Sequence, residues 1–202
     1  MQMSALVRLV CAIGAVTMLL GGCARSQPTR FYVLTAAYRP DHATSEQPGG
    51  KQRALGVGPI RFPEYLDRPQ ITGRSSVNLL TLAEFDRWAE PLESGFSRVL
   101  AENLSVLLST DRVLQFPWKS SEPIDFRITV NVVRFDGGPE KQVSLVTRWA
   151  VFGPEGNELV PLTGSRIVMP VKRAGYEALA IALSEAIGKL SQEIASALRT
   201  AG

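Results

Sequence analysis

The segment Ile124–Phe135, with the sequence IDFRITVNVVRF, carries the strongest strand pattern in the chain and sets the expected fold. Apolar residues at every second position alternate with Asp, Arg, Thr and Asn as far as Val132, which is typical of a strand with one buried face. The alternation then changes phase, because Val133 and Phe135 are apolar whereas Arg134 is polar. A phase change inside a strand predicts a β-bulge at this point.

The segments that follow extend this strand into an antiparallel meander. Asp136-Gly137-Gly138 is a turn signal, and the alternation resumes in Gln142–Phe152. A second turn is expected at Gly153–Asn157, and Glu158–Met169 is expected to return as a third strand. The middle of the chain therefore predicts three long, sequentially paired strands.

Two helices and several shorter strands are expected around the meander. Apolar residues from Trp88 to Leu107 recur at helical spacing, with Pro91 in the first turn and Asn103 as the one polar residue on that face. A second apolar face runs from Leu179 to Leu198. Further apolar runs bring the expected total to seven or eight strands: Arg30–Thr35, Arg53–Ile60, Gln70–Arg74, Val77–Leu82 and Val113–Phe116.

These elements predict a single α+β domain over residues 30–202. Its sheet is expected to be mixed or mostly antiparallel, with the two amphipathic helices packed on one face. The same apolar helix faces could also line a lipid-binding groove between helices and sheet. Periodicity does not separate a packed core from such a groove.

The N-terminus has the pattern of a lipoprotein signal. Arg8 is the only charged residue among the first 24, and the apolar run Leu9–Leu20 is about 12 residues long, too short for a membrane span of roughly 20. The sequence Leu20-Gly21-Gly22-Cys23 that follows resembles the lipobox of bacterial lipoproteins. This resemblance implies a signal peptide at 1–22, lipid on Cys23, and a short anchor and linker at 23–29. The alternative is an ordinary secreted protein with a chance cysteine.

The residue after the lipidated cysteine bears on location. In the lipoprotein pattern an aspartate there favours retention at the inner membrane, and this chain has Ala24. The expected location is therefore the periplasmic face of the outer membrane, held by the lipid anchor.

Composition argues against several classes of function. The formal net charge is +3, falling to +2 without the signal segment, and no cluster of Lys and Arg appears, so no nucleic-acid partner is expected. The only histidine, His42, lies in a polar stretch, and the only cysteines are Cys11 and Cys23. A His/Cys zinc site and a nucleophile–histidine site are therefore not expected. The sequence predicts no enzyme, no metal and no cofactor.

The stretch RFPEYLDRPQ at 61–70 is unusual for a connection between strands. Pro63 and Pro69 restrict the backbone at both ends, and between them lie an aromatic, an aliphatic and an arginine side chain. A preorganised loop of this kind suits a protein interface, because Tyr and Arg are frequent at interface hot spots. The simpler alternative is a structural loop that covers a sheet edge.

Several segments together resemble the PqiC-like ABC-type transport auxiliary lipoprotein family. The resemblance runs in order over nearly the whole chain, and its most specific part includes the loop above. The matching segments, besides the lipobox, are Phe31–Thr35, Val57–Ile71, Arg87–Leu92, Arg148–Phe152 and Tyr176–Ala195.

The resemblance implies a non-catalytic subunit of an MCE-type phospholipid transport system. Its implied partners are an MCE-domain protein that bridges the periplasm and an inner-membrane transporter, with the outer membrane reached through the lipid anchor. Homo-oligomers are a further arrangement that it allows. Two alternatives are a lipid carrier with its own acyl-binding cavity and a lipoprotein that activates a cell-wall enzyme. The candidate partner-binding residues are Tyr65, Leu66, Asp67, Arg68, Arg87 and Trp88.

Overall fold

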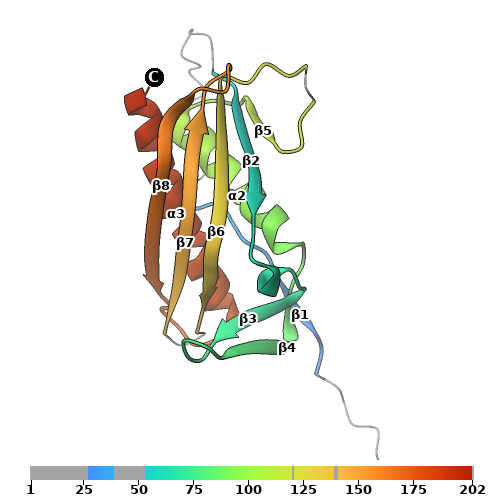
Figure 1. Cartoon of the computed structure of the whole chain (residues 1–202). Helices are drawn as coiled ribbons and strands as arrows, with labels where there is room; N and C mark the ends of the chain where they lie inside the picture. Colours follow the sequence, from blue (N-terminus) through green and yellow to red (C-terminus); the bar gives the residue numbers. More distant parts are fainter. Residues whose placement is uncertain (1–26, 39–52, 120, 139–140, 202) are drawn as a thin grey trace, which may run out of the picture.

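The strand predicted from the alternation is β6 (Phe126–Gly137), and it lies at the centre of the sheet in the computed structural model (Figure 1). It pairs antiparallel with β7 (Gln142–Phe152), which pairs antiparallel with β8 (Glu158–Pro170). The predicted meander is therefore confirmed. The structure describes residues 27–38, 53–119, 121–138 and 141–201, so the signal segment, Cys23 and His42 lie outside the described residues.

The predicted β-bulge is also confirmed. The register between β6 and β7 shifts between the pairs Val132–Thr147 and Arg134–Val146, so Val133 has no partner across the ladder. Because of this extra residue, Phe135 faces the core and is 1% exposed. Asp136 then lies on the opposite face of the sheet.

The remaining described strands complete an eight-stranded mixed sheet. β2 pairs parallel with both β5 and β6, and β1 pairs parallel with β4. β3 and β4 form an antiparallel hairpin that joins β6 where Gly73 pairs with Gly137. Their bounds are β1 (Arg30–Tyr32), β2 (Leu55–Arg61), β3 (Gln70–Arg74), β4 (Leu80–Trp88) and β5 (Val113–Gln115).

The structure corrects two expected element boundaries near the hairpin, the start of a strand and the start of a helix. The strand expected at Val77–Leu82 starts later and runs to Trp88, because Ser75 donates its backbone N–H to the carbonyl of Leu79 (3.0 Å) and closes a turn. Trp88 therefore ends a strand and does not belong to the helix face. Pro91 is the N-cap of the helix α2 (Leu92–Leu108) and precedes its first turn.

The first predicted strand is also shorter than expected. After β1, the chain crosses the helices, where the backbone N–H of Thr35 donates to the hydroxyl of Ser184 (3.1 Å). The backbone N–H groups of Ala37 and Tyr38 donate to the side-chain oxygen of Asn103, at 2.9 and 3.2 Å. The polar residue on the apolar face of α2 thus holds this crossing segment.

Both helices cover one face of the sheet, as predicted (Figure 1). The helix α3 (Tyr176–Ala201) packs on β7 and β8, whereas α2 packs on β2 and β5. The space between helices and sheet is filled by a continuous apolar cluster rather than a groove. Fully buried members of this cluster include Phe96, Leu100, Leu104, Phe135, Leu145, Ile187 and Leu190.

A polar contact joins α3 to the sheet beneath it. The indole N–H of Trp149 donates to the hydroxyl of Ser165 (2.8 Å), and this hydroxyl donates to the carboxylate of Glu193.

Within the described residues, none of the helices combines the length and the apolar character that crossing a membrane requires.

Candidate functional site at the β3–β4 hairpin

The loop between the two prolines folds into a single turn of 3-10 helix, η1 (Glu64–Leu66), followed by a turn. The N–H of Leu66 donates to the carbonyl of Pro63 (3.0 Å), and the N–H of Asp67 donates to that of Glu64 (3.0 Å). The loop is also tied to the hairpin, because the carbonyl of Pro69 accepts from the N–H of Trp88 (2.7 Å). The loop is therefore ordered by its own hydrogen bonds before any partner binds.

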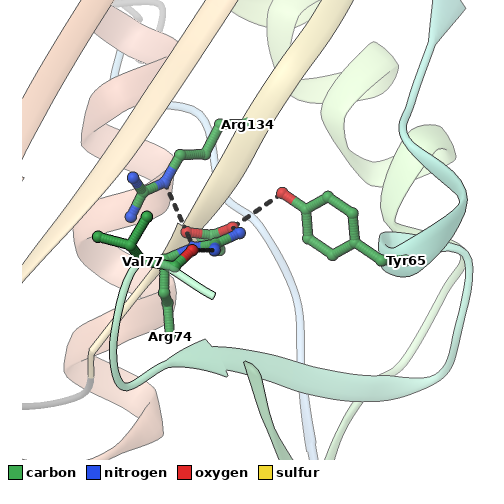
Figure 2. Close-up of polar contacts among 5 residues, drawn as sticks. Tyr65, Arg74, Val77 and Arg134 are labelled. Atoms are coloured by element: carbon green, nitrogen blue, oxygen red, sulfur yellow. Dashed lines mark hydrogen bonds and ion pairs between the residues drawn. The ribbon is translucent and has the colours of Figure 1, made fainter. Parts of the chain in front are cut away.

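Three side chains converge on the carboxylate of Asp136, which is 1% exposed (Figure 2). Arg74 binds both carboxylate oxygens, with Nε–Oδ1 at 2.9 Å and Nη2–Oδ2 at 2.8 Å. The hydroxyl of Tyr65 donates to Oδ2 (2.8 Å), and Nε of Arg134 donates to Oδ1 (2.8 Å). This Asp136 cluster joins η1, β3 and β6, which are distant in the sequence.

The electrostatics of the Asp136 cluster favour a permanently ionised pair. Burial alone would raise the pKa of the Asp136 carboxyl, but the hydrogen bonds from Arg74, Tyr65 and Arg134 outweigh it and lower that pKa. The hydrogen bond to Asp136 raises the pKa of Arg74. Burial, followed by the hydrogen bond to Asp136, raises the pKa of Tyr65 to about 12. These shifts keep Asp136 ionised and Tyr65 protonated near neutral pH, so the hydrogen bonds between them persist and the arrangement braces the fold.

A second cluster, with one arginine fewer, joins β1 to β4. Arg30 binds both oxygens of the Asp86 carboxylate, at 2.8 and 3.0 Å, and the hydroxyl of Tyr32 donates to the same group (2.7 Å). Burial would raise the pKa of Asp86, but the hydrogen bonds from Arg30 and Tyr32 lower it. The two clusters differ in exposure, since the side chain of Arg30 is 63% exposed and that of Arg74 is 17% exposed.

The structure places the six predicted partner-binding residues close to this hairpin but not on one surface. Leu66 and Trp88 belong to the core, with exposures of 3% and 7%. Tyr65 is half-buried and turns its hydroxyl inward to Asp136. These three therefore shape the loop and offer little contact area.

The other three predicted residues retain groups that a partner could reach. Asp67 is exposed, and Arg68 and Arg87 are partly exposed. Among the described residues, Nε of Arg68 and Nε of Arg87 are buried without a hydrogen-bond partner. These Nε atoms are out of a partner's reach, so a carboxylate from another molecule could bind only the exposed part of each arginine side chain. The partner-binding role stays a prediction for these residues.

Sequence reasoning missed the charged residues that organise the site. Two glycines after Asp136 indicate a turn, Arg74 ends a predicted strand, and the polarity of Arg134 indicates only the bulge. The signal that could have found them is a charged residue inside or directly beside an alternating strand, where an unpaired charge would be costly.

We expect Tyr65→Phe to lose about 1.5 kcal/mol of unfolding free energy at neutral pH, because it removes a hydrogen bond to a charged acceptor from a half-buried ring. The raised pKa of Tyr65 gives a further test. A phenol whose pKa rises on folding contributes stability below its unfolded value of about 10, and loses that contribution as the pH rises through about 12.

Urea unfolding between about pH 8 and pH 11.5 measures the loss caused by Tyr65→Phe and the loss caused by alkaline pH. This range brackets the unfolded phenol pKa of about 10. The wild type should lose more stability than Tyr65→Phe across this range. Tyr176→Phe is a control for the loss at neutral pH only, because burial raises the pKa of Tyr176 as well, although no side-chain hydrogen bond among the described residues contributes to that rise. Equal alkaline losses in the wild type and Tyr65→Phe would contradict the role given to this hydroxyl.

The described residues contain pockets but no metal-binding cluster. A surface pocket of about 550 Å³ lies beside α2, and its lining includes Arg98, Glu102 and Asp111. No group of three or more His, Cys, Asp or Glu residues in the described part of the chain could hold a metal ion. The lining mixes these charged side chains with apolar ones such as Val106 and Val113.

Comparison with known families identifies the chain. The family model described as the ABC-type transport auxiliary lipoprotein component matches residues 32–195. The chain belongs to this family. The match covers the domain except for the start of β1 and the end of α3, and it includes both the loop between the prolines and the Asp136 cluster. A search of the curated proteins found no match.

Solved structures share the fold of this auxiliary lipoprotein. An uncharacterised protein of known crystal structure is 20% identical, with a TM-score of 0.69 over 85% of this chain and 99% of its own. Protein XCC0632 from Xanthomonas campestris is 15% identical, with a TM-score of 0.66 over 86% of this chain and 97% of its own. At these identities the likeness extends to the fold alone.

Proposed function

We propose that this auxiliary lipoprotein is a non-catalytic subunit of an MCE-type phospholipid transport system. In this role it is held by lipid on Cys23 at the periplasmic face of the outer membrane. There it docks the periplasm-spanning MCE protein, whose other end meets an inner-membrane transporter. Loss of the subunit then weakens the outer membrane because its phospholipids are no longer kept in balance.

One observation carries this proposal: a family match over residues 32–195 lies directly behind a lipobox that ends at Cys23. The family description gives the association with ABC-type transport and the lipoprotein character. The lipobox sequence, with Ala24 after the cysteine, supports the outer-membrane location. The MCE partner is what the sequence resemblance implies.

The contact surface for the partner is proposed at the base of the β3–β4 hairpin. Arg68 and Arg87 carry buried Nε atoms that lack partners among the described residues, and Asp67 beside them is exposed. An acidic segment of the partner could pair with both guanidinium groups. This narrows the six predicted residues to three that a partner can reach.

The lipid-carrier alternative has less support. The apolar faces of α2 and α3 are buried in the core, where Phe96, Leu100, Ile187 and Leu190 are 0% exposed. The pocket beside α2 is lined by both charged and apolar residues. Extraction of the purified protein followed by mass spectrometry would show a bound phospholipid if the carrier reading were correct.

The experiment compares the wild type with Cys23→Ser in envelope fractions and in partner capture. We expect the wild type to fractionate with the outer membrane and to retain the MCE protein after crosslinking, whereas Cys23→Ser should take up no labelled palmitate and leave that fraction. Arg68→Glu with Arg87→Glu should stay lipidated but capture at least ten-fold less partner. Wild-type protein that is lipidated and captures no MCE protein under any crosslinking condition would overturn the proposed function.

A further inference from the structure

Exposed apolar side chains gather at the hairpin and the strand beside it. The described residues include ten large hydrophobic side chains that are exposed, and five of these lie in or next to β1 and the β3–β4 hairpin. Val77 is 86% exposed, Leu79 57% and Leu82 49%, all within six residues of one another. Such a concentration at one projecting element marks a contact surface rather than chance exposure. The other two members of the group are Phe31 and Val33.

The segment Ser75–Leu82, called here the hairpin tip, is held in place although it is exposed. Nη1 of Arg74 donates to the carbonyl of Val77 (2.8 Å), and the same guanidinium group binds the buried carboxylate of Asp136 (Figure 2). The N–H of Ser75 donates to the carbonyl of Leu79 (3.0 Å). The apolar side chains are thus presented from a braced backbone, which lowers the entropic cost of using them.

The hairpin tip lies at the end of the molecule from which the chain leads to the anchor. Figure 1 shows the hairpin and the first described residues at one end, opposite the C-terminus of α3. Arg30, the first residue of β1, is bound to Asp86 of β4. Six residues (24–29) separate Cys23 from Arg30, and the seven Cα–Cα steps between the two can span at most roughly 25 Å. A lipid on Cys23 would therefore keep this end of the domain near the bilayer.

Two basic residues lie in the segments that adjoin the base of the β3–β4 hairpin, Lys141 close to Gly138 and Arg173 two residues after Val171. Gly73 pairs with Gly137, and Lys141 lies just beyond at the start of β7, with its carbonyl accepting from the N–H of Val171 (3.1 Å). Lys141 and Arg173 are exposed and make no ion pair among the described residues. Apolar side chains flanked by free cations fit the interface of a bilayer that contains anionic phospholipids.

We propose that the hairpin tip enters the headgroup region of the membrane that holds the lipid anchor. Val77, Leu79 and Leu82 contact the acyl boundary, and Lys141 and Arg173 contact anionic headgroups. The domain then has a fixed orientation, in which the end that carries the hairpin and β1 faces the bilayer and the C-terminus of α3 points away from it. The proposal rests on the lipid anchor of the proposed function, and it adds a second, protein-made contact.

A fluorescence experiment on the full-length, processed lipoprotein tests this contact. Val77→Cys and Leu79→Cys each introduce the only free thiol, because Cys23 is occupied by lipid and Cys11 leaves with the signal peptide. Each variant is labelled with an environment-sensitive fluorophore and reconstituted into vesicles of phosphatidylethanolamine and phosphatidylglycerol. We expect emission several-fold higher than that of the same labelled protein in detergent-free solution at low lipid concentration. We also expect a spin-labelled phospholipid to quench this emission.

Matched controls come from exposed apolar positions elsewhere. Leu162→Cys on β8 and Ile181→Cys on α3 replace side chains that are 65% and 51% exposed, and their labels should stay in water. Adding Lys141→Glu and Arg173→Glu to labelled Val77→Cys should reduce the signal, and so should omitting the anionic lipid. Circular dichroism confirms that each variant is folded.

The outcomes separate this proposal from the proposed function. Labels at positions 77 and 79 that remain in water, or that are no more lipid-exposed than those at 162 and 181, overturn the membrane contact. An emission change that follows protein density and is insensitive to the spin-labelled lipid also overturns it, since a second copy of the chain then covers the tip. Either result leaves MCE capture intact if the docking role is correct. Failure of capture with full lipid contact rejects the docking role alone.

Discussion

Asp136→Ala is expected to lower the free energy of unfolding by about 3–5 kcal/mol, the usual cost of removing one member of a buried ion pair. The substitution leaves the guanidinium groups of Arg74 and Arg134 and the hydroxyl of Tyr65 without their shared acceptor. The side chain of Arg74 is only 17% exposed, so it cannot recover full hydration. Chemical unfolding followed by circular dichroism measures the loss.

Asp86→Ala is the matched control, because Asp86 also binds an arginine and a tyrosine. Its loss should be clearly smaller, since the side chain of Arg30 is 63% exposed and can return to water. If the two substitutions destabilise the domain equally, burial of the Arg74 guanidinium group is not what makes the Asp136 cluster important. A loss below about 1 kcal/mol for Asp136→Ala would contradict the bracing role altogether.

Acid should act on the same two carboxylates. Their pKa values are lower in the folded domain than in the unfolded chain, through the hydrogen bonds that outweigh burial. Such groups contribute stability above their unfolded pKa of about 3.9 and lose that contribution as the pH falls through their folded values. Acid unfolding of the wild type should therefore begin below about pH 4.

Leu190→Ala is expected to cost about 2–5 kcal/mol, because it leaves a cavity where α3 packs on the sheet. Leu190 is 0% exposed and belongs to the main apolar cluster together with Ile187 and Ile194. Ile181→Ala, on the same helix, should change stability by less than about 0.5 kcal/mol, since its side chain is 51% exposed. Urea unfolding of both variants compares the two faces of α3.

Similar small losses for Leu190→Ala and Ile181→Ala would mean that α3 is not packed as described. A large loss for Ile181→Ala would instead show that its exposed face is covered by another molecule in solution. The contrast between two apolar residues on one helix makes the test independent of helix propensity.

Local periodicity was sufficient for the parts of the fold in which each residue's neighbours are close in sequence. The alternation in β6 and β7 and the helical spacing in α3 identified these elements and their buried faces. It was insufficient at Trp88, where an apolar residue at helical spacing belongs to a strand. The N–H of Trp88 donates to the carbonyl of Pro69, a contact between distant segments that local periodicity does not reveal.

Pairing between distant segments could not be predicted. The parallel pairs of β2 with β5 and β6, and of β1 with β4, depend on contacts across 50 or more residues. The Asp136 cluster has the same origin, since Tyr65 lies 71 residues before its acceptor. The sequence singled out Tyr65 for its chemistry, but only the fold shows that its hydroxyl is already occupied.

The extra residue in β6 determines how the chain tolerates changes in length. Because Val132 and Arg134 pair with the consecutive residues Thr147 and Val146, deletion of Val133 would leave a regular ladder with Phe135 and Asp136 on their present faces. If Val133 instead paired in the ladder, the two faces beyond it would be exchanged, which would place a carboxylate among the aromatic rings and a phenyl group beside Arg74. Insertions and deletions should also be accepted in the turn at 153–157, where they leave the alternation on both strands unchanged.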